Sequence, residues 1–371
     1  MNPRYTIHDS SSLLSPSLVI YRSLVVANLK AMLAMAGSAD RLRPHIKTHK
    51  MPEIVKLTES LGIHKHKCAT IAEADMAAAA GARDILIAFP IVGPNIARVA
   101  QLIQLYPDTT FRLLIDHPEV AKSLSAGLGS LNKPVAAIVD LEVGMGRTGI
   151  APGDEALALY ELIASLPNLI PDGLSAYDGH LNDPDPEVRR TRAMVGLEQT
   201  LTLRDRLEAK GLPVPRMVLG GTPTFPIHAQ VQEPGVECSP GTTTLYDHGY
   251  AAKYADLPFV PAALVLTRVV SQPRPGRLCL DLGHKAVAAD PPVGHRVQLL
   301  DMADVTFVGH SEEHLVIETP HANDFPPGSV VMGIPTHVCP TCALHRWAYV
   351  VDDGEVVDRW WISAGDRVLN V

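Results

Sequence analysis

Lys47 lies in an unusually dense run of ionisable side chains, Arg43-Pro44-His45-Ile46-Lys47-Thr48-His49-Lys50. A lysine amine can attack a carbonyl compound and form an imine when rigid backbone positions it and when burial or neighbouring cations lower its pKa. His45 and His49 are both candidates for hydrogen-bonding neighbours of this amine. The alternative interpretation of such a cluster is a solvated basic loop, which needs no reactive group.

Two glycine-rich stretches have the composition of anion-binding backbone. One is Gly144–Gly149, which contains Arg147, and the other is Gly220-Gly221-Thr222, which is followed by Thr224. Glycine lets backbone N–H groups approach a phosphate closely, and a threonine hydroxyl adds a further hydrogen bond. Without other evidence, a Gly-Gly-Thr sequence indicates only a turn.

A third group of reactive residues is His337-Val338-Cys339-Pro340-Thr341-Cys342, with His345 three residues further on. On an extended strand, His337 and Cys339 would point to the same side, where an imidazole and a thiolate suit zinc. Three alternatives remain open: a Cys-x-x-Cys redox pair, a structural zinc site with four ligands, and buried cysteines with no ligand role.

Short β-branched runs alternate with Ala- and Leu-rich helical segments from Leu18 to about Gly241. This alternation predicts an α/β fold with a parallel sheet, and the number of strands favours a closed TIM-type (β/α)8 barrel over an open sheet. The expected barrel strands are Arg43–Thr48, Lys67–Thr70, Ile85–Phe89, Phe111–Ile115, Val135–Leu141, Leu174–Tyr177, Met217–Leu219 and Val236–Ser239.

The candidate residues occupy comparable places on this expected barrel. Lys47 and Tyr177 would end the first and sixth strands, while Arg147 and Gly220-Gly221-Thr222 would follow the fifth and seventh. Because barrel active sites form at the carboxyl ends of the strands, these residues should converge on one rim. His180, three residues after Tyr177, could act as a base near that rim.

The sequence changes character after about Thr242, where strand-like segments are separated by Pro, Gly and Asp-Gly turn signals. This pattern predicts a carboxyl-terminal antiparallel β domain. We therefore expect residues 22–241 to form a cofactor-binding barrel, and residues 1–21 plus 242–371 to form the β domain with the metal site.

Composition excludes several other classes of protein. The net charge of −8 is spread along the 371 residues without a basic stripe, which argues against nucleic-acid binding. The longest apolar stretches are far shorter than the ~20 residues that cross a membrane, and the first 17 residues lack a signal-peptide pattern. Five cysteines, an odd number, favour a reducing cytoplasm over a disulfide framework.

Together these motifs resemble one known family. The segment Pro44–Lys50, the Gly144–Gly149 stretch with Arg147, Gly220-Gly221-Thr222 and the segment His337–Thr341 are similar to those of D-threonine aldolases and D-serine dehydratases. These are alanine-racemase-like enzymes of fold type III that use pyridoxal 5'-phosphate. The resemblance extends in order over nearly the whole chain, and its first and last motifs are its most specific.

The resemblance implies a role for each motif. Lys47 would carry the cofactor as a Schiff base, Arg147 would meet its phenolic oxygen, and Tyr177 would lie beside its pyridine ring. Gly220, Gly221 and Thr222 would bind its phosphate. His337 and Cys339 would hold a divalent metal (Mn, Mg or Zn). The family also implies that the amino terminus contributes a strand to the β domain, and that a homodimer forms.

The resemblance leaves more than one reaction open. Overall similarity around Asp281–Lys285 favours an aldolase that cleaves a small D-β-hydroxy-α-amino acid to glycine and an aldehyde. Cys339 instead favours a dehydratase that releases a keto acid and ammonia, because the aldolases have Asp at this position. Asp178 also differs from the His of the aldolase pattern. Further alternatives are an amino-acid racemase, which needs no metal, and a cofactor-binding protein without activity.

Overall fold

The computed structural model describes residues 3–131 and 133–369, and the chain divides into two compact units. The barrel unit comprises Met32–Lys47, Pro52–Gly241 and the residues that follow Asp366. The β unit comprises Thr242–Asp366, Thr48–Met51 and the segment that ends at Ala31. Helix α1 (Arg22–Ala36) therefore contributes residues to both units.

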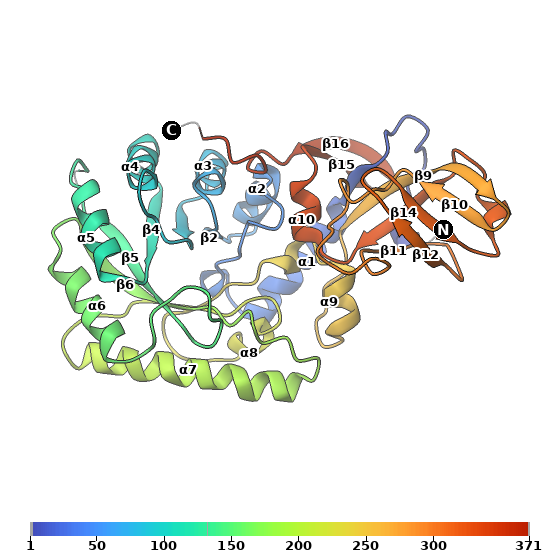
Figure 1. Cartoon of the computed structure of the whole chain (residues 1–371). Helices are drawn as coiled ribbons and strands as arrows, with labels where there is room; N and C mark the ends of the chain where they lie inside the picture. The colour runs from blue at the N-terminus through green and yellow to red at the C-terminus, as the bar shows by residue number, and fades with distance from the viewer. Residues whose placement is uncertain (1–2, 132, 370–371) are drawn as a thin grey trace. The chain divides into compact units, whose positions relative to one another are not determined.

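The barrel unit contains a parallel sheet whose strands pair in chain order (Figure 1). Its strands are β2 (Lys65–Cys68), β3 (Asp84–Ile87), β4 (Thr110–Ile115), β5 (Val135–Leu141), β6 (Leu169–Ala176), β7 (Met217–Leu219) and β8 (Val236–Cys238). Its helices are α2 (Pro52–Ser60), α3 (Ile71–Ala79), α4 (Asn95–Leu105), α5 (Pro118–Gly127), α6 (Asp154–Ser165), α7 (Pro186–Glu208) and α8 (Phe225–His228). One helix follows each of the strands β2–β7, so the expected α/β barrel class is confirmed.

The segment that closes the barrel differs from the predicted strand Arg43–Thr48. Only two isolated parallel bridges form here, from Leu42 to Cys238 of β8 and from His45 to Lys67 of β2. Pro44 has no N–H to donate to a ladder, and residues 46–49 turn away. The segment still joins the two edge strands, and it places Lys47 in a turn just beyond the bridge at His45.

The barrel interior is layered along the strands. A central apolar layer is formed by the buried side chains of Leu86, Leu114, Ile138 and Val218, which lie on four different strands. On the carboxyl side of this layer the interior becomes polar, as described for the site below. On the amino side, a network of charged residues fills the barrel.

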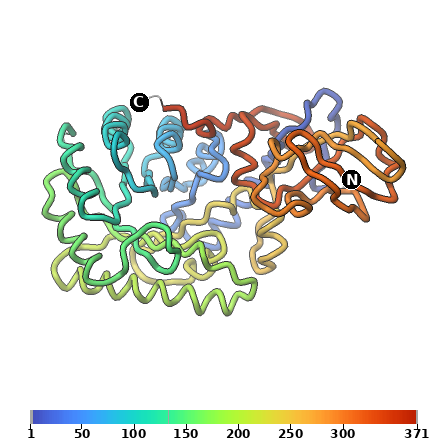
Figure 2. Tube along the Cα trace, viewed as in Figure 1, coloured from blue at the N-terminus to red at the C-terminus, as the bar shows by residue number. Residues whose placement is uncertain are grey.

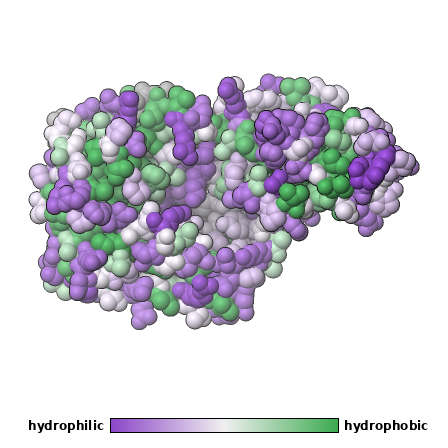
Figure 3. All heavy atoms as spheres, in the orientation of Figure 1, coloured by the Kyte–Doolittle hydropathy of each residue, from purple (hydrophilic) through white to green (hydrophobic). Residues whose placement is uncertain are grey.

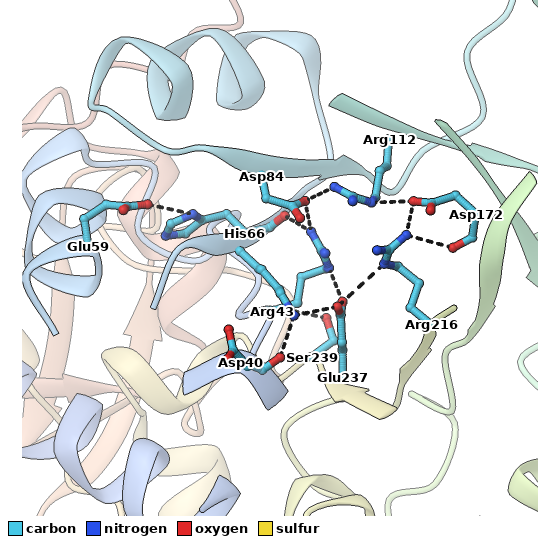
Figure 4. A network of polar contacts seen from close by, with 11 residues as sticks. Asp40, Arg43, Glu59, His66, Asp84, Arg112, Asp172, Arg216, Glu237 and Ser239 are labelled. Atoms are coloured by element: carbon cyan, nitrogen blue, oxygen red, sulfur yellow. Dashed lines mark hydrogen bonds and ion pairs between the residues drawn. The ribbon is translucent and has the colours of Figure 1, made fainter. Parts of the chain in front are cut away.

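Arg43 is the centre of that charged network (Figure 4). Its guanidinium group is fully buried, and it donates to Glu237 on β8 and to Asp84 on β3, each over 2.6 Å. Arg112 of β4 continues the network by pairing with Asp84 and, over 2.6 Å, with Asp172 of β6. The network therefore connects strands β3, β4, β6 and β8 at the amino-terminal end of the barrel.

Replacement of Arg43 by alanine is expected to destabilise the barrel unit by about 3 to 5 kcal/mol, because it leaves buried carboxylates without their main partner. Arg206→Ala is the matched control: it removes an exposed ion pair with Asp154 and should cost at most about 1 kcal/mol. Urea denaturation of the three proteins measures both values. Equal losses in the two variants would show that the Arg43 network contributes no more than a surface ion pair.

The β unit is built around strand β1 (Ser17–Tyr21), which lies between β9 (Ala263–Arg274) and β15 (Trp347–Asp352). Figure 2 shows this amino-terminal segment among the strands near the end of the chain. The contribution of the amino terminus to this sheet is thus confirmed. The expected antiparallel β domain is confirmed, and its sheet also contains one parallel pair, because β1 is antiparallel to β9 but parallel to β15.

The remaining elements of the β unit complete the sheet and flank it. The strands are β10 (Arg277–Leu280), β11 (Val297–Leu299), β12 (Thr306–His310), β13 (Leu315–Glu318), β14 (Val330–Pro335) and β16 (Glu355–Trp361). Two short helices are α9 (His248–Lys253) and α10 (Val338–Ala343). Sequence patterns missed β11 and β12, because the first has only three residues and the second contains a glycine at a register shift.

No helix in the described part of the chain is long and apolar enough to span a bilayer. On the face drawn in Figure 3, hydrophobic residues are interspersed with hydrophilic ones.

Candidate active site

The barrel unit has a cavity of about 250 Å³ at the carboxyl ends of its strands. This volume is close to the lower limit of about 300 Å³ that is typical of small-molecule sites. The polar and charged residues that line it include Lys47, Lys67, Asp140, Arg147, Ser175 and Tyr177. Three residues predicted from the sequence, Lys47, Arg147 and Tyr177, therefore meet at one cavity.

The ring of Tyr177 is the common neighbour of the cations in this cavity. The guanidinium carbon of Arg147 lies 5.0 Å from the ring centroid, and the ammonium nitrogen of Lys47 lies 5.8 Å from it. The backbone N–H of Lys47 donates to Nδ1 of His45 over 3.3 Å. This hydrogen bond helps to shape the turn that presents the lysine.

Three further polar residues, which the sequence did not predict, line the same cavity: Lys67, Asp140 and Ser175. Lys67 Nζ also lies 5.8 Å from the Tyr177 centroid. Burial lowers the pKa of Lys67 to about 8 and raises that of Asp140 to about 6, although each charge opposes the other's shift. Asp140 lies in the otherwise apolar strand Val135–Leu141, and this was the signal that could have found it, whereas Lys67 lies in the polar strand Lys65–Cys68 and had no such signal.

Ser175 contributes a buried hydroxyl group to the same cavity. Its hydroxyl oxygen is buried and has no hydrogen-bond partner among the described residues. A buried hydroxyl without a partner costs free energy, which a bound polar ligand or water would recover. The cavity therefore has the cationic and hydroxyl groups that suit an anionic cofactor with a carbonyl group.

The raised pKa of Asp140 predicts a specific pH dependence of stability. A folded-state pKa near 6, above the ordinary value of 3.8, makes the folded protein lose stability as the pH rises from about 4 to 6. Asp140→Asn removes this titration, so the free energy of unfolding of wild type minus variant should fall by about 1 to 3 kcal/mol across that interval. Urea denaturation of both cofactor-free proteins at several pH values measures the difference. If the free energies of unfolding of the two proteins change in parallel with pH, the raised pKa of Asp140 is contradicted.

Glu142 holds the loop Gly144–Gly149 in place. Its carboxylate accepts the N–H groups of Gly144 and Gly146, over 2.5 and 2.8 Å. Gly149 has φ +105°, and a Cβ there would lie 2.7 Å from the Glu142 nitrogen, so this position requires glycine. The loop thereby carries Arg147 and Thr148 to the cavity.

The turn Gly220-Gly221-Thr222 lies beside Tyr177. A Cβ on Gly221 would approach Cε2 of the tyrosine to 3.1 Å, and a Cβ on Gly220 would lie 2.5 Å from the ring of His228. Thr222 is buried, and its hydroxyl accepts the N–H of Gly241 over 3.2 Å. Glycine is thus needed for close packing of this turn, and its role in binding an anion stays a prediction.

His180 is placed against the glycine-rich loop. A Cβ on Gly144 would lie 2.6 Å from its Nε2, and its Nδ1 is buried without a hydrogen-bond partner in the described residues. The cavity at Lys47 is not lined by His180. A role as base therefore stays a prediction.

His337 and Cys339 lie together in the β unit, but not on a strand. The expectation of an extended His-x-Cys is wrong: β14 ends at Pro335, His337 caps α10, and Cys339 lies in the first turn of that helix. Asp247 fixes the start of the helix by accepting the Val338 N–H over 3.0 Å. Burial lowers the pKa of His337, but hydrogen bonds with Cys339 and Asp290 outweigh it and raise the pKa to about 9.

Asp290 is a further residue that sequence analysis missed, because 47 residues separate it from His337. Its carboxylate lies 2.5 Å from Nδ1 of His337, so Asp290 engages Nδ1 and not Nε2. A carboxylate on the outer nitrogen is the usual support of a metal-binding histidine. The described residues contain no cluster of three or more His, Cys, Asp or Glu arranged for a metal, so the role of His337 and Cys339 as metal donors stays a prediction.

Comparison with known proteins agrees with this architecture. The family model of the alanine racemase N-terminal domain matches residues 20–244, and that of a putative serine dehydratase domain matches residues 262–351. The D-threonine aldolase of Arthrobacter sp. is 32% identical over 94% of this chain and 92% of its own length. The 3-hydroxy-D-aspartate aldolase of Paracoccus denitrificans (strain Pd 1222) is 28% identical over 96% of this chain and 93% of its own.

Among solved structures, the D-threonine aldolase of Filomicrobium marinum matches with a TM-score of 0.89 and 27% identity, covering 97% of both chains. Barrel, cavity and matches together define an alanine-racemase-like enzyme of fold type III, a class that uses pyridoxal phosphate. Within that class, the chain belongs to the family of D-threonine aldolases, hydroxyaspartate aldolases and D-serine dehydratases, and it is a lyase.

Proposed function

We propose that this enzyme cleaves D-β-hydroxy-α-amino acids to glycine and an aldehyde, in the manner of a D-threonine aldolase, with pyridoxal phosphate and a divalent metal. The observation that carries the proposal is the convergence of Lys47, Arg147 and Tyr177 on one cavity. The similarity to D-threonine aldolase over 94% of the chain supports the choice of reaction.

In this proposal the barrel residues hold the cofactor. Lys47 would bind its carbonyl carbon, Arg147 would hold its phenolic oxygen, and Tyr177 would lie beside its ring. Gly220, Gly221 and Thr222 would hold its phosphate. Bound there, pyridoxal phosphate supplies an electron sink for negative charge at the substrate Cα.

His337 and Cys339 would hold the metal, with Asp290 orienting the imidazole through Nδ1. A nitrogen and a sulfur donor suit zinc, while manganese and magnesium remain candidates. When bound, the metal supplies Lewis acidity for the β-hydroxyl of the substrate. Within the β unit, the hydroxyl of Thr48 lies 3.2 Å from Cys339 Sγ.

The reaction needs a base for the β-hydroxyl, and His180 is our proposed candidate. The base takes the hydroxyl proton, the Cα–Cβ bond breaks, and its electron pair stays on Cα while the β-carbon leaves as an aldehyde. A proton returned to Cα then gives glycine. A neutral imidazole suits such proton transfer near neutral pH.

A dehydratase is the second candidate, favoured by Cys339 and by the match of residues 262–351 to a putative serine dehydratase domain. In that case Lys47 removes the Cα proton and hydroxide leaves from Cβ. Hydrolysis of the product then gives a keto acid and ammonia. A racemase would use the same barrel and would need no metal.

Identification of products separates these reactions. With D-threonine, an aldolase yields glycine and acetaldehyde, whereas a dehydratase yields 2-oxobutyrate and converts D-serine to pyruvate. Full activity after chelation, with only the opposite enantiomer formed, would favour a racemase. Absence of turnover despite an imine absorbance band would indicate a binding protein. We also propose a homodimer, as the family implies, which analytical ultracentrifugation tests.

A further inference from the structure

Asp178, the residue after Tyr177, is a buried carboxylate whose two oxygens are both engaged. Oδ1 accepts a hydrogen bond from the Thr224 hydroxyl over 2.7 Å, and Oδ2 lies 2.8 Å from Nε2 of His228. The side chains of Asp178 and His228 are only 7% and 4% exposed. Asp178 does not line the cavity at Lys47. Its geometry is therefore that of a support and not that of a base acting on substrate.

Thr224 connects this carboxylate to the glycine turn. While its hydroxyl donates to Asp178, the same oxygen accepts the N–H of Gly221 over 3.2 Å. A continuous chain of hydrogen bonds thus runs from His228 through Asp178 and Thr224 to Gly221. The Thr224 hydroxyl has one proton, which it donates to Asp178, so its oxygen is left to accept the hydrogen bond from the Gly221 N–H.

Steric contacts show how closely the turn is fitted to these side chains. Gly220 has φ +68°, and a Cβ there would lie 2.5 Å from His228 and 2.7 Å from the Thr224 hydroxyl. Asp178 and His228 also line a small cavity of about 10 Å³. That volume admits one water molecule, which suits His228 Nδ1, a buried atom with no partner in the described residues.

We propose that Asp178 is a positioning residue: through Thr224 and His228 it holds the turn Gly220-Gly221-Thr222 in the shape that receives the phosphate of the cofactor. The inference rests on the proposed function, which assigns the phosphate to this turn. This arrangement explains how a carboxylate can lie close to a site for a phosphate. Both oxygens of Asp178 accept hydrogen bonds from buried donors, Thr224 and His228, so its negative charge is compensated.

The test compares two ligands that differ only in the phosphate. Cofactor-free enzyme is titrated with pyridoxal phosphate and with pyridoxal, and binding is followed by absorbance. Thr224→Val keeps the shape of the side chain but removes both hydrogen bonds, so it should weaken pyridoxal phosphate binding by about 10- to 100-fold. Binding of pyridoxal should change by less than about 3-fold. Thr224→Ser keeps the hydroxyl and should restore the affinity for pyridoxal phosphate.

Asp178→Asn provides an independent variant of nearly the same shape. It should weaken pyridoxal phosphate binding in the same direction, and combining it with Thr224→Val should add little, because both act on one chain of hydrogen bonds. Unchanged affinity for pyridoxal phosphate in both variants, or equal losses for the two ligands, would overturn the inference. If the wild type itself binds pyridoxal as tightly as pyridoxal phosphate, the phosphate assignment fails instead, and with it that part of the proposed function.

Discussion

Replacement of Lys47 by alanine is expected to reduce turnover by at least about 10³-fold and to remove the imine absorbance of the bound cofactor. The amine lies in the barrel cavity, 5.8 Å from the Tyr177 ring centroid, on a turn that begins where the chain leaves its bridge to β2. Without this amine, the protein has no covalent bond to the cofactor at this position. Absorbance spectra and steady-state rates with D-threonine measure both effects.

Two other lysine variants control this experiment. Lys122→Ala removes an exposed amine that pairs with Glu119 on helix α5, and it should leave rate and spectrum unchanged. Lys67→Ala removes the second lysine of the same cavity, and it should retain the imine band even if the rate falls. An imine band that persists in Lys47→Ala but disappears in Lys67→Ala would exchange the roles of the two residues.

The second large effect is expected at the two proposed metal donors. His337→Ala and Cys339→Ser should each lower activity by more than about 100-fold, because loss of a direct ligand exceeds the 10- to 100-fold effect typical of supporting residues. Asp290→Asn, which alters only the support of the imidazole, should fall within that smaller range. The measurement is the rate of chelated enzyme titrated with zinc or manganese.

Matched controls exist for both donor variants. Cys279→Ser changes a thiol on strand β10, and His321→Ala changes a half-exposed imidazole. Both should respond to added metal as the wild type does. Wild-type metal dependence in His337→Ala and Cys339→Ser would rule out these residues as the metal site.

The sequence was sufficient to predict the barrel and part of its site for a simple topological reason. Strands of a parallel barrel end on one rim, so the positions of Arg147 and Tyr177 relative to predicted strands were enough to bring them together with Lys47. The exact path of the chain was less predictable. Pro44 interrupts the first strand, and the hydrogen bonds that nevertheless close the barrel come from neighbours distant in sequence.

Other residues were missed because their partners are remote. Lys67 and Asp140 lie on strands that face each other only after the barrel has closed, and Asp290 reaches His337 across 47 residues. The helix at Val338 was missed because its capping carboxylate, Asp247, lies 91 residues earlier in the chain. Local patterns carry no information about such pairings, whereas the motif His337-Val338-Cys339 was visible without them.

Borohydride reduction of the cofactor-loaded enzyme, followed by peptide mass spectrometry, tests the central assignment most directly. Reduction converts an imine to a stable secondary amine, so the pyridoxyl group stays on the residue that carried it. We expect the label on the peptide that contains Lys47. A label on the peptide that contains Lys67, or no label on any lysine of a protein that binds the cofactor, would contradict the account.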